Sequence, residues 1–187
     1  MKLAASFFLS IKHWQLFLLT TIVGLAYAIS VISQPAFLER SSVRLIVMNG
    51  LNLLIMLGWM WTAGTFLQSK LQPSLRLNIR IFYFALVVPF LSLLPDLMEA
   101  SGRFPGVHAA SVVVGVVGFF CVLYDIGFVA ESLWRAEKGT VPSSFGAVAG
   151  NFILIWAFPI GVWFIQPKIN RLYAERTDGP PDNIHFA

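Results

Sequence analysis

The chain has 187 residues, of which 57% are hydrophobic and 12% charged, and its mean hydropathy is +0.76. A soluble domain of this length needs more polar surface than this composition supplies, so an ordinary soluble globular protein is excluded. The net charge of +4 does not indicate nucleic-acid binding, because the basic residues stand singly or in small groups beside apolar runs. The single cysteine, Cys121, excludes an internal disulfide and a multi-cysteine zinc site.

Five long apolar runs make up more than half of the chain and contain none of its 13 Lys and Arg residues. They cover residues 14–32, 45–67, 81–95, 109–130 and 145–165. Hydrocarbon does not solvate cations, so runs without Lys or Arg are typical of membrane-spanning segments. A helix satisfies its own backbone hydrogen bonds in lipid. The alternation of polar and apolar residues that is typical of β-barrel strands is missing from these runs. The sequence therefore predicts an all-α polytopic transmembrane bundle of about five spanning helices over residues 1–166, with a short polar tail over 167–187.

The first run is either a retained helix or a signal peptide. Lys2 and Lys12 precede it, and residues 26–28 (Ala-Tyr-Ala) loosely resemble a cleavage site. The apolar stretch continues past that point to residue 32, which gives it the length of a span. We therefore expect a retained helix.

Prolines interrupt the third and fifth runs. The third run is short and carries Pro89 and Pro95, so it either crosses with a kink or draws Asp96 into the interface. The fifth run has span length and no charge, but Pro159 and Gly161 fall in its second half. We expect this run to cross the membrane with a kink there, and a re-entrant turn is the alternative.

The basic residues of the connections predict the topology, since cytoplasmic loops are enriched in Lys and Arg. The N-terminal segment holds two, the second connection three and the third connection only Arg103, which favours the N-terminus inside. Five full crossings divide the basic residues seven inside and six outside, which hardly discriminates. If the fifth run re-enters, the tail joins the inside and the division becomes ten against three.

One face of the fourth run indicates helix packing. Ser111, Gly115, Gly118 and Asp125 fall within about 80° of one another at roughly 100° per residue. Small residues let helices approach closely, so we expect this face to lie against protein. Asp125 would then be a costly buried acid, either neutral or paired. Three interpretations of Asp125 stay open: a marker of the headgroup level, a structural hydrogen-bonding group, or a functional acid.

Weaker signals occur on the other runs. Two further sets of small residues have the four-residue spacing of helix-packing faces: Gly146 and Gly150 at the start of the fifth run, and Thr20, Gly24 and Ala28 on the first. Three amides inside the apolar runs need hydrogen-bond partners, ordinarily from a neighbouring helix: Asn49, Asn52 and Asn151. Together with Asp125 these amides are the candidate buried polar or ion site.

Catalytic and cofactor motifs are missing from the sequence. A b-type haem needs two histidines at matched depth, but on this topology His13 and His108 begin helices on opposite sides. No HExxH, GxSxG or glycine-rich phosphate loop is present. We therefore expect no cofactor, no metal site and no enzymatic activity.

The last third of the chain carries a resemblance. The sequences FPIGVW at 158–163 and QPKIN at 166–170 resemble the closing segment of a family of small, uncharacterised multispanning bacterial membrane proteins, and residues 129–133 and 151–156 fit the same pattern. The resemblance implies a bacterial inner-membrane setting and supplies no activity. In this segment we expect Gln166-Pro167 to end the fifth helix, and Lys168, Asn170 and Arg171 to meet phosphates at the headgroup level.

These observations favour a non-catalytic integral membrane subunit or accessory protein of a larger membrane assembly. Its expected partners are the lipid bilayer and either other membrane-protein subunits or a second copy of the chain. The alternative is a small transporter or channel subunit. Asp125 would then be the ion or proton site, and a helix broken at Pro159 and Gly161 would help to form it.

Overall fold

The computed structural model describes residues 8, 11–32, 43–101 and 108–177, and these residues form a bundle of α-helices without a strand. The first half contains α2 (His13–Ile32), α3 (Val43–Lys70), the short 3-10 helix η1 (Pro73–Leu75), α4 (Ile79–Leu91) and α5 (Leu93–Ala100). The second half contains α6 (His108–Lys138), α7 (Phe145–Trp156) and α8 (Phe158–Thr177). The predicted all-α bundle is confirmed.

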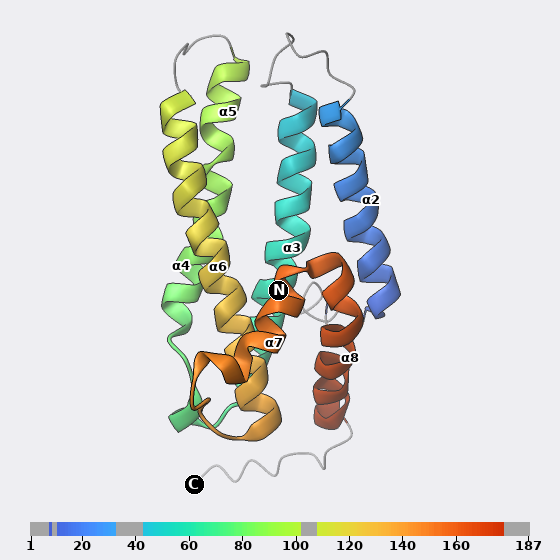
Figure 1. Cartoon of the computed structure of the whole chain (residues 1–187), viewed down its shortest axis with the longest axis vertical. Coiled ribbons are helices and arrows are strands. Elements are labelled where there is room, and N and C mark those ends of the chain that lie inside the picture. The colour runs from blue at the N-terminus through green and yellow to red at the C-terminus, as the bar shows by residue number, and fades with distance from the viewer. Residues whose placement is uncertain (1–7, 9–10, 33–42, 102–107, 178–187) are drawn as a thin grey trace, which may run out of the picture.

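Figure 1 shows the long helices running along the same axis. At one end of the bundle α2 and α5 end, and α3 and α6 begin. At the opposite end α3, α6 and α8 end, and α4 and α7 begin. We name this second end the hairpin end, because the α7–α8 hairpin starts and finishes there. The core lies mainly between α3, α6 and α8, and it extends to α4, where the rings of Phe82 and Phe128 stack at a centroid distance of 4.2 Å. Gly64 of α3 makes room for this stack, because an added Cβ would lie 2.7 Å from Phe82.

Three helical stretches are long and apolar enough to cross a membrane: Leu45–Lys70, Ile79–Met98 and Val112–Lys138. The bent pair formed by α7 and α8 would make a fourth, whereas the apolar stretch Trp14–Ile29 of α2 is shorter. The number is therefore three or four among the described residues, against the five predicted. These helices have the length and composition of an integral membrane protein.

The outer surface agrees with a lipid environment. Large apolar side chains are more than half exposed on several helices, among them Ile22, Phe84, Val112, Phe120 and Ile160. Such a surface is unusual on a soluble monomer but ordinary where the solvent is hydrocarbon.

The third run forms α4 and α5, which together make one candidate span with a small irregularity after Pro89. At that irregularity the Ser92 hydroxyl donates to the Pro89 carbonyl oxygen at 2.6 Å. This arrangement agrees with the predicted crossing with a kink.

The fifth run does not form one straight helix. It breaks at Ala157, whose backbone leaves the helical region, and α7 and α8 meet at a bend of 120°. The Ala157 carbonyl oxygen then accepts from the N–H groups of Ile160 and Gly161, which starts α8. Pro159 fits this first turn because a helix start needs no N–H there. The chain turns back here and α8 returns to the hairpin end (Figure 1), a bend that fits either a broken span or a re-entrant turn.

The prediction that Gln166-Pro167 ends the helix is wrong. α8 continues through Pro167 to Thr177. A proline removes one backbone hydrogen bond and bends a helix, but side-chain contacts made by its neighbours can hold the helix together across it.

Candidate functional site

Gln166 connects α8 to two other parts of the chain. This side chain is fully buried. Its Oε1 accepts from Trp59 Nε1 of α3 at 2.8 Å, and its Nε2 donates to the carbonyl oxygen of Phe8 at 3.0 Å and to Asn170 Oδ1 at 2.9 Å. Asn170 Nδ2 in turn donates to the carbonyl oxygen of Ile11 at 3.4 Å. These bonds fasten the returning helix against α3 and the segment before α2.

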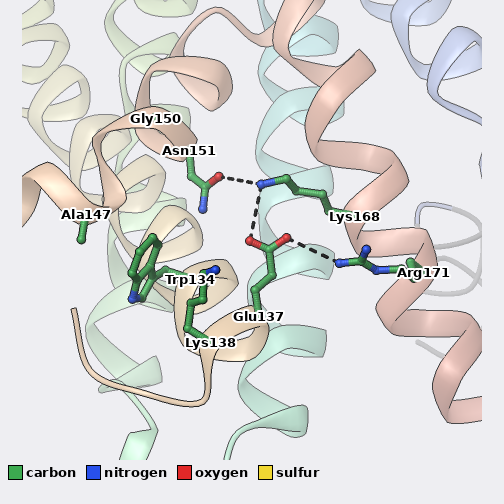
Figure 2. Close-up of a pocket in the computed structure, with 8 residues that line it drawn as sticks. All are labelled: Trp134, Glu137, Lys138, Ala147, Gly150, Asn151, Lys168 and Arg171. Atoms are coloured by element: carbon green, nitrogen blue, oxygen red, sulfur yellow. Dashed lines mark hydrogen bonds and ion pairs between the residues drawn. The ribbon is translucent and has the colours of Figure 1, made fainter.

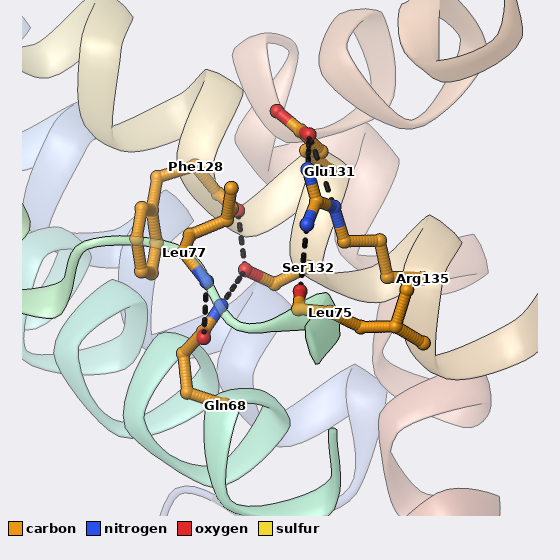
Figure 3. A network of polar contacts seen from close by, with 7 residues as sticks. All are labelled: Gln68, Leu75, Leu77, Phe128, Glu131, Ser132 and Arg135. Carbon is orange, nitrogen blue, oxygen red and sulfur yellow. Dashed lines mark hydrogen bonds and ion pairs between the residues drawn. The ribbon is translucent and has the colours of Figure 1, made fainter. Parts of the chain in front are cut away.

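A second buried network joins α3, α6 and the connection that leads into α4 (Figure 3). Gln68 Nε2 donates to Ser132 Oγ at 2.8 Å, and Ser132 Oγ donates to the carbonyl oxygen of Phe128 at 2.6 Å. Gln68 Oε1 accepts from the backbone N–H of Leu77 at 2.9 Å. A single glutamine therefore fixes both the α3–α6 contact and the start of the chain towards α4.

Arg135 of α6 fixes the α3–α4 connection from the other side (Figure 3). Its guanidinium forms an ion pair with Glu131 one turn earlier, and its Nη1 donates to the carbonyl oxygen of Leu75 at 2.6 Å. The connection is therefore held at η1 by a charge-assisted bond, which is stronger than a neutral one.

A polar cavity lies at the hairpin end, where α6 ends and α7 and α8 fold back (Figure 2). Its volume is about 410 Å³. Lys168 Nζ lies between Asn151 Oδ1 of α7 at 3.2 Å and Glu137 Oε2 of α6 at 3.4 Å. Arg171 Nη2 lies 3.9 Å from the other carboxylate oxygen of Glu137. Lys138 adds a third cation to the lining.

Asp125 is fully buried on α6, and neither of its carboxylate oxygens has a hydrogen-bond partner among the described residues. Gly118 lies two turns before Asp125 and is close to α4, because a Cβ added there would be 3.3 Å from Pro89 Cα. Ser132 lies two turns after Asp125 and bonds to Gln68 of α3. Residues seven apart share a helix face, so Asp125 faces the α3–α4 seam.

The four candidate polar residues do not converge. Asn49 and Asn52 lie near the start of α3, at the end opposite the hairpin end, and both are half-buried. Asn151 lines the cavity at the hairpin end, and Asp125 belongs to neither group. The ion path that would join them is therefore not formed as one site.

The small residues predicted to form helix-packing faces differ in whether they contact another helix. Gly118 makes a close contact with α4, whereas an added Cβ at Gly24, Gly115 or Gly150 would meet no described atom within 4 Å. The Thr20 hydroxyl donates to carbonyl oxygens of its own helix. A Cβ at Gly146 would meet only Ser144 Oγ at 3.5 Å, and Ala28 is half-buried on α2. The side chain of Ser111 lies outside the described part of the chain.

The sequence alone did not indicate the residues that join the helices by polar contacts: Gln166, Gln68, Ser132, Arg135 and Glu137. The available signal was a polar side chain inside or just beyond an apolar run, because such groups are rarely left unpaired. Their partners are far apart in sequence, as in Trp59 and Gln166. The partnership is therefore not visible from spacing.

Within the described ranges, no group of three or more His, Cys, Asp or Glu residues is placed to hold a metal ion. Comparisons with models of known protein families, with curated proteins and with solved structures gave no match for this chain. The resemblance of the C-terminal segment therefore remains a prediction.

Proposed function

We propose that this chain is a non-catalytic integral membrane subunit that assembles with other membrane-protein subunits or with a second copy of itself. One observation carries this proposal: Gly24 of α2 and Gly115 of α6 leave open space beside the helix backbone. Small residues at lipid depth let a neighbouring helix approach closely. Inside the chain no described helix uses either position, so both remain for a partner.

The buried polar groups support the same proposal. Gln166, Gln68 and Arg135 each make hydrogen bonds between different segments, so their polar atoms serve the packing of the bundle. Such interhelical bonds are the ordinary structural use of polar residues in membrane helices.

The proposed setting is a bacterial inner membrane with the N-terminus on the cytoplasmic side. The membrane type is proposed from the C-terminal resemblance. The orientation is proposed from the α7–α8 hairpin. If α8 returns, the tail lies on the same side as the N-terminus, and that side then holds ten Lys and Arg residues against three on the other. Cytoplasmic segments carry the excess of Lys and Arg.

Native mass measurement after mild detergent extraction tests the assembly. We expect species above the monomer mass, and fewer of them for Gly24→Leu and Gly115→Leu, because the added side chains would fill the space left for a partner helix without meeting a described atom of the chain itself at the Cβ. Val113→Leu, on an exposed position of α6, is the matched control and should change nothing. A strictly monomeric parent at all loadings contradicts the proposal.

A second candidate function is a small transporter or channel subunit. It is favoured by one observation, a fully buried carboxylate with no described partner, in a bundle that also contains a helix pair bent by 120°. Buried acids and broken helices both occur in ion and proton pathways. Proton or cation flux into liposomes should then fall for Asp125→Asn. No flux in the parent, or equal flux in the variant, contradicts this candidate.

A further inference from the structure

The cavity at the hairpin end has the charge and position of an anion site. Three cations, Lys138, Lys168 and Arg171, line it against one carboxylate, Glu137. Its volume of about 410 Å³ falls within the range of small-molecule pockets. We propose that this cavity binds the phosphate group of an anionic phospholipid headgroup.

The cations are only loosely held by the protein. The distances from Lys168 Nζ to Glu137 and Asn151 are 3.4 and 3.2 Å, longer than the usual charge-assisted hydrogen bond. An ammonium carries three donors, so one remains beyond these two contacts. Arg171 reaches Glu137 only at 3.9 Å, and 65% of its side chain is exposed. A phosphate in the cavity can therefore accept from both residues while Glu137 keeps them in place.

The ring of Trp134 forms part of the lining, and its buried Nε1 lies on the side away from Lys168 (Figure 2). The ammonium of Lys138 lies 5.8 Å from the centroid of the Trp134 ring, so this cation lies beside the Trp134 side of the cavity. Tryptophan is common at the headgroup level, because one side of its ring system is apolar and its N–H is polar.

The surroundings favour a lipid over a free phosphate ion. α7 lines the cavity with Gly150 and Asn151, and on other faces it exposes Phe145, Ile153 and Trp156 by half or more. Acyl chains can lie along these exposed side chains while the headgroup occupies the cavity. Basic pockets between membrane helices recognise anionic headgroups in this way.

The test is lipid binding to the purified full-length protein in detergent, measured by native mass spectrometry. The added ligands are short-chain phosphatidylglycerol, phosphatidylcholine of equal chain length, and inorganic phosphate. We expect one bound phosphatidylglycerol and weaker phosphatidylcholine binding. The double variant Lys138→Gln/Arg171→Gln should weaken phosphatidylglycerol binding about tenfold or more, because two charge-assisted contacts are removed.

Two further variants separate the cavity from general surface charge. Gly150→Leu should also weaken binding, because it fills the cavity without removing a charge, whereas Gly150→Ala should bind like the parent. Arg80→Gln removes an exposed cation at the same end outside the cavity and is the matched control. Circular dichroism and gel filtration establish that each variant is folded.

Each outcome has a defined meaning. Equal binding of the two lipids, or a loss in Arg80→Gln as large as in the double variant, overturns the proposal. Binding of inorganic phosphate that responds to Gly150→Leu, without any lipid preference, supports the phosphate site but assigns it to the free ion and overturns the lipid. These results are independent of the oligomeric state, so failure here leaves the proposed assembly untouched.

Discussion

At the residue scale, two buried polar side chains behave in opposite ways. Gln166 uses its amide oxygen for Trp59 and its amide nitrogen for acceptors on two segments. Asp125 is equally buried but has no hydrogen-bond partner among the described residues. A buried amide with all its bonds stabilises a packing arrangement, whereas a buried group without partners costs free energy.

Replacing Gln166 should therefore destabilise the bundle. Gln166→Leu leaves the Trp59 N–H without its acceptor, and we expect a loss of about 2–4 kcal/mol, since each orphaned buried group costs roughly 1–3 kcal/mol. Thermal unfolding in detergent measures the change. The control is Gln72→Leu at an exposed position before η1, which should leave the midpoint in place. Equal midpoints for both variants would show that the Gln166 bonds add nothing to stability.

Replacing Asp125 should have a different pattern. Asp125→Asn should keep or raise the unfolding midpoint, because the amide retains the shape and removes a buried charge. Asp125→Leu should cost on the order of 1–3 kcal/mol by overpacking the seam with α3 and α4 that Asp125 faces. Val116→Leu, on an exposed position of the same helix, is the control. If all three variants melt with the parent, Asp125 does not lie in a packed interior.

At the element scale, the hairpin was only partly predictable. Pro159 and Gly161 indicate an interruption, and the break falls at Ala157, directly before the turn that contains them. The continuation of α8 through Pro167 was not predictable from local rules. It depends on the contacts of Gln166 and Asn170 with Trp59, Phe8 and Ile11, which are more than 100 residues away in sequence.

Gly161 should be the residue on which the hairpin depends most. An added Cβ there would overlap the Leu154 carbonyl oxygen and lie 2.9 Å from Leu154 Cα. Because the obstacle is backbone, Gly161→Ala forces α7 and α8 apart, and we expect a loss of more than about 2 kcal/mol, in line with overpacking of a tight site. Thermal unfolding and a spin-label distance between α7 and α8 measure it.

The matched control is Gly150→Ala on α7, where an added Cβ meets no described atom within 4 Å. This variant should melt with the parent and keep the same distance between the two helices. A Gly161→Ala protein with an unchanged midpoint and distance would mean that α7 and α8 do not approach each other this closely.

At the scale of the whole molecule, composition and the apolar runs were sufficient to predict the helical bundle, since hydrocarbon leaves few alternatives for the backbone. The cavity was predicted only in fragments. Lys168 and Arg171 were expected to meet phosphates, and both line the cavity. Asn170 was grouped with them but bonds to Gln166 and Ile11 instead. Glu137, which gathers the two cations, lies on another helix, so no local pattern contained it.

The topology of the chain depends on the hairpin. If α8 returns to the hairpin end, its last turns lie on the same side of the membrane as the α3–α4 and α6–α7 connections. If the fifth run crosses, they lie on the opposite side, with the end of α5.

Cysteine labelling from each side of a membrane vesicle measures this directly. Cys121→Ala provides the background, and single cysteines are placed at Ser74, Ser143, Ser101 and Ala174. An impermeant maleimide should label Ala174→Cys from the same side as Ser74→Cys and Ser143→Cys, and Ser101→Cys only from the other. Labelling of Ala174→Cys together with Ser101→Cys would show that the last apolar run crosses the membrane, and would contradict the re-entrant hairpin and the orientation based on it.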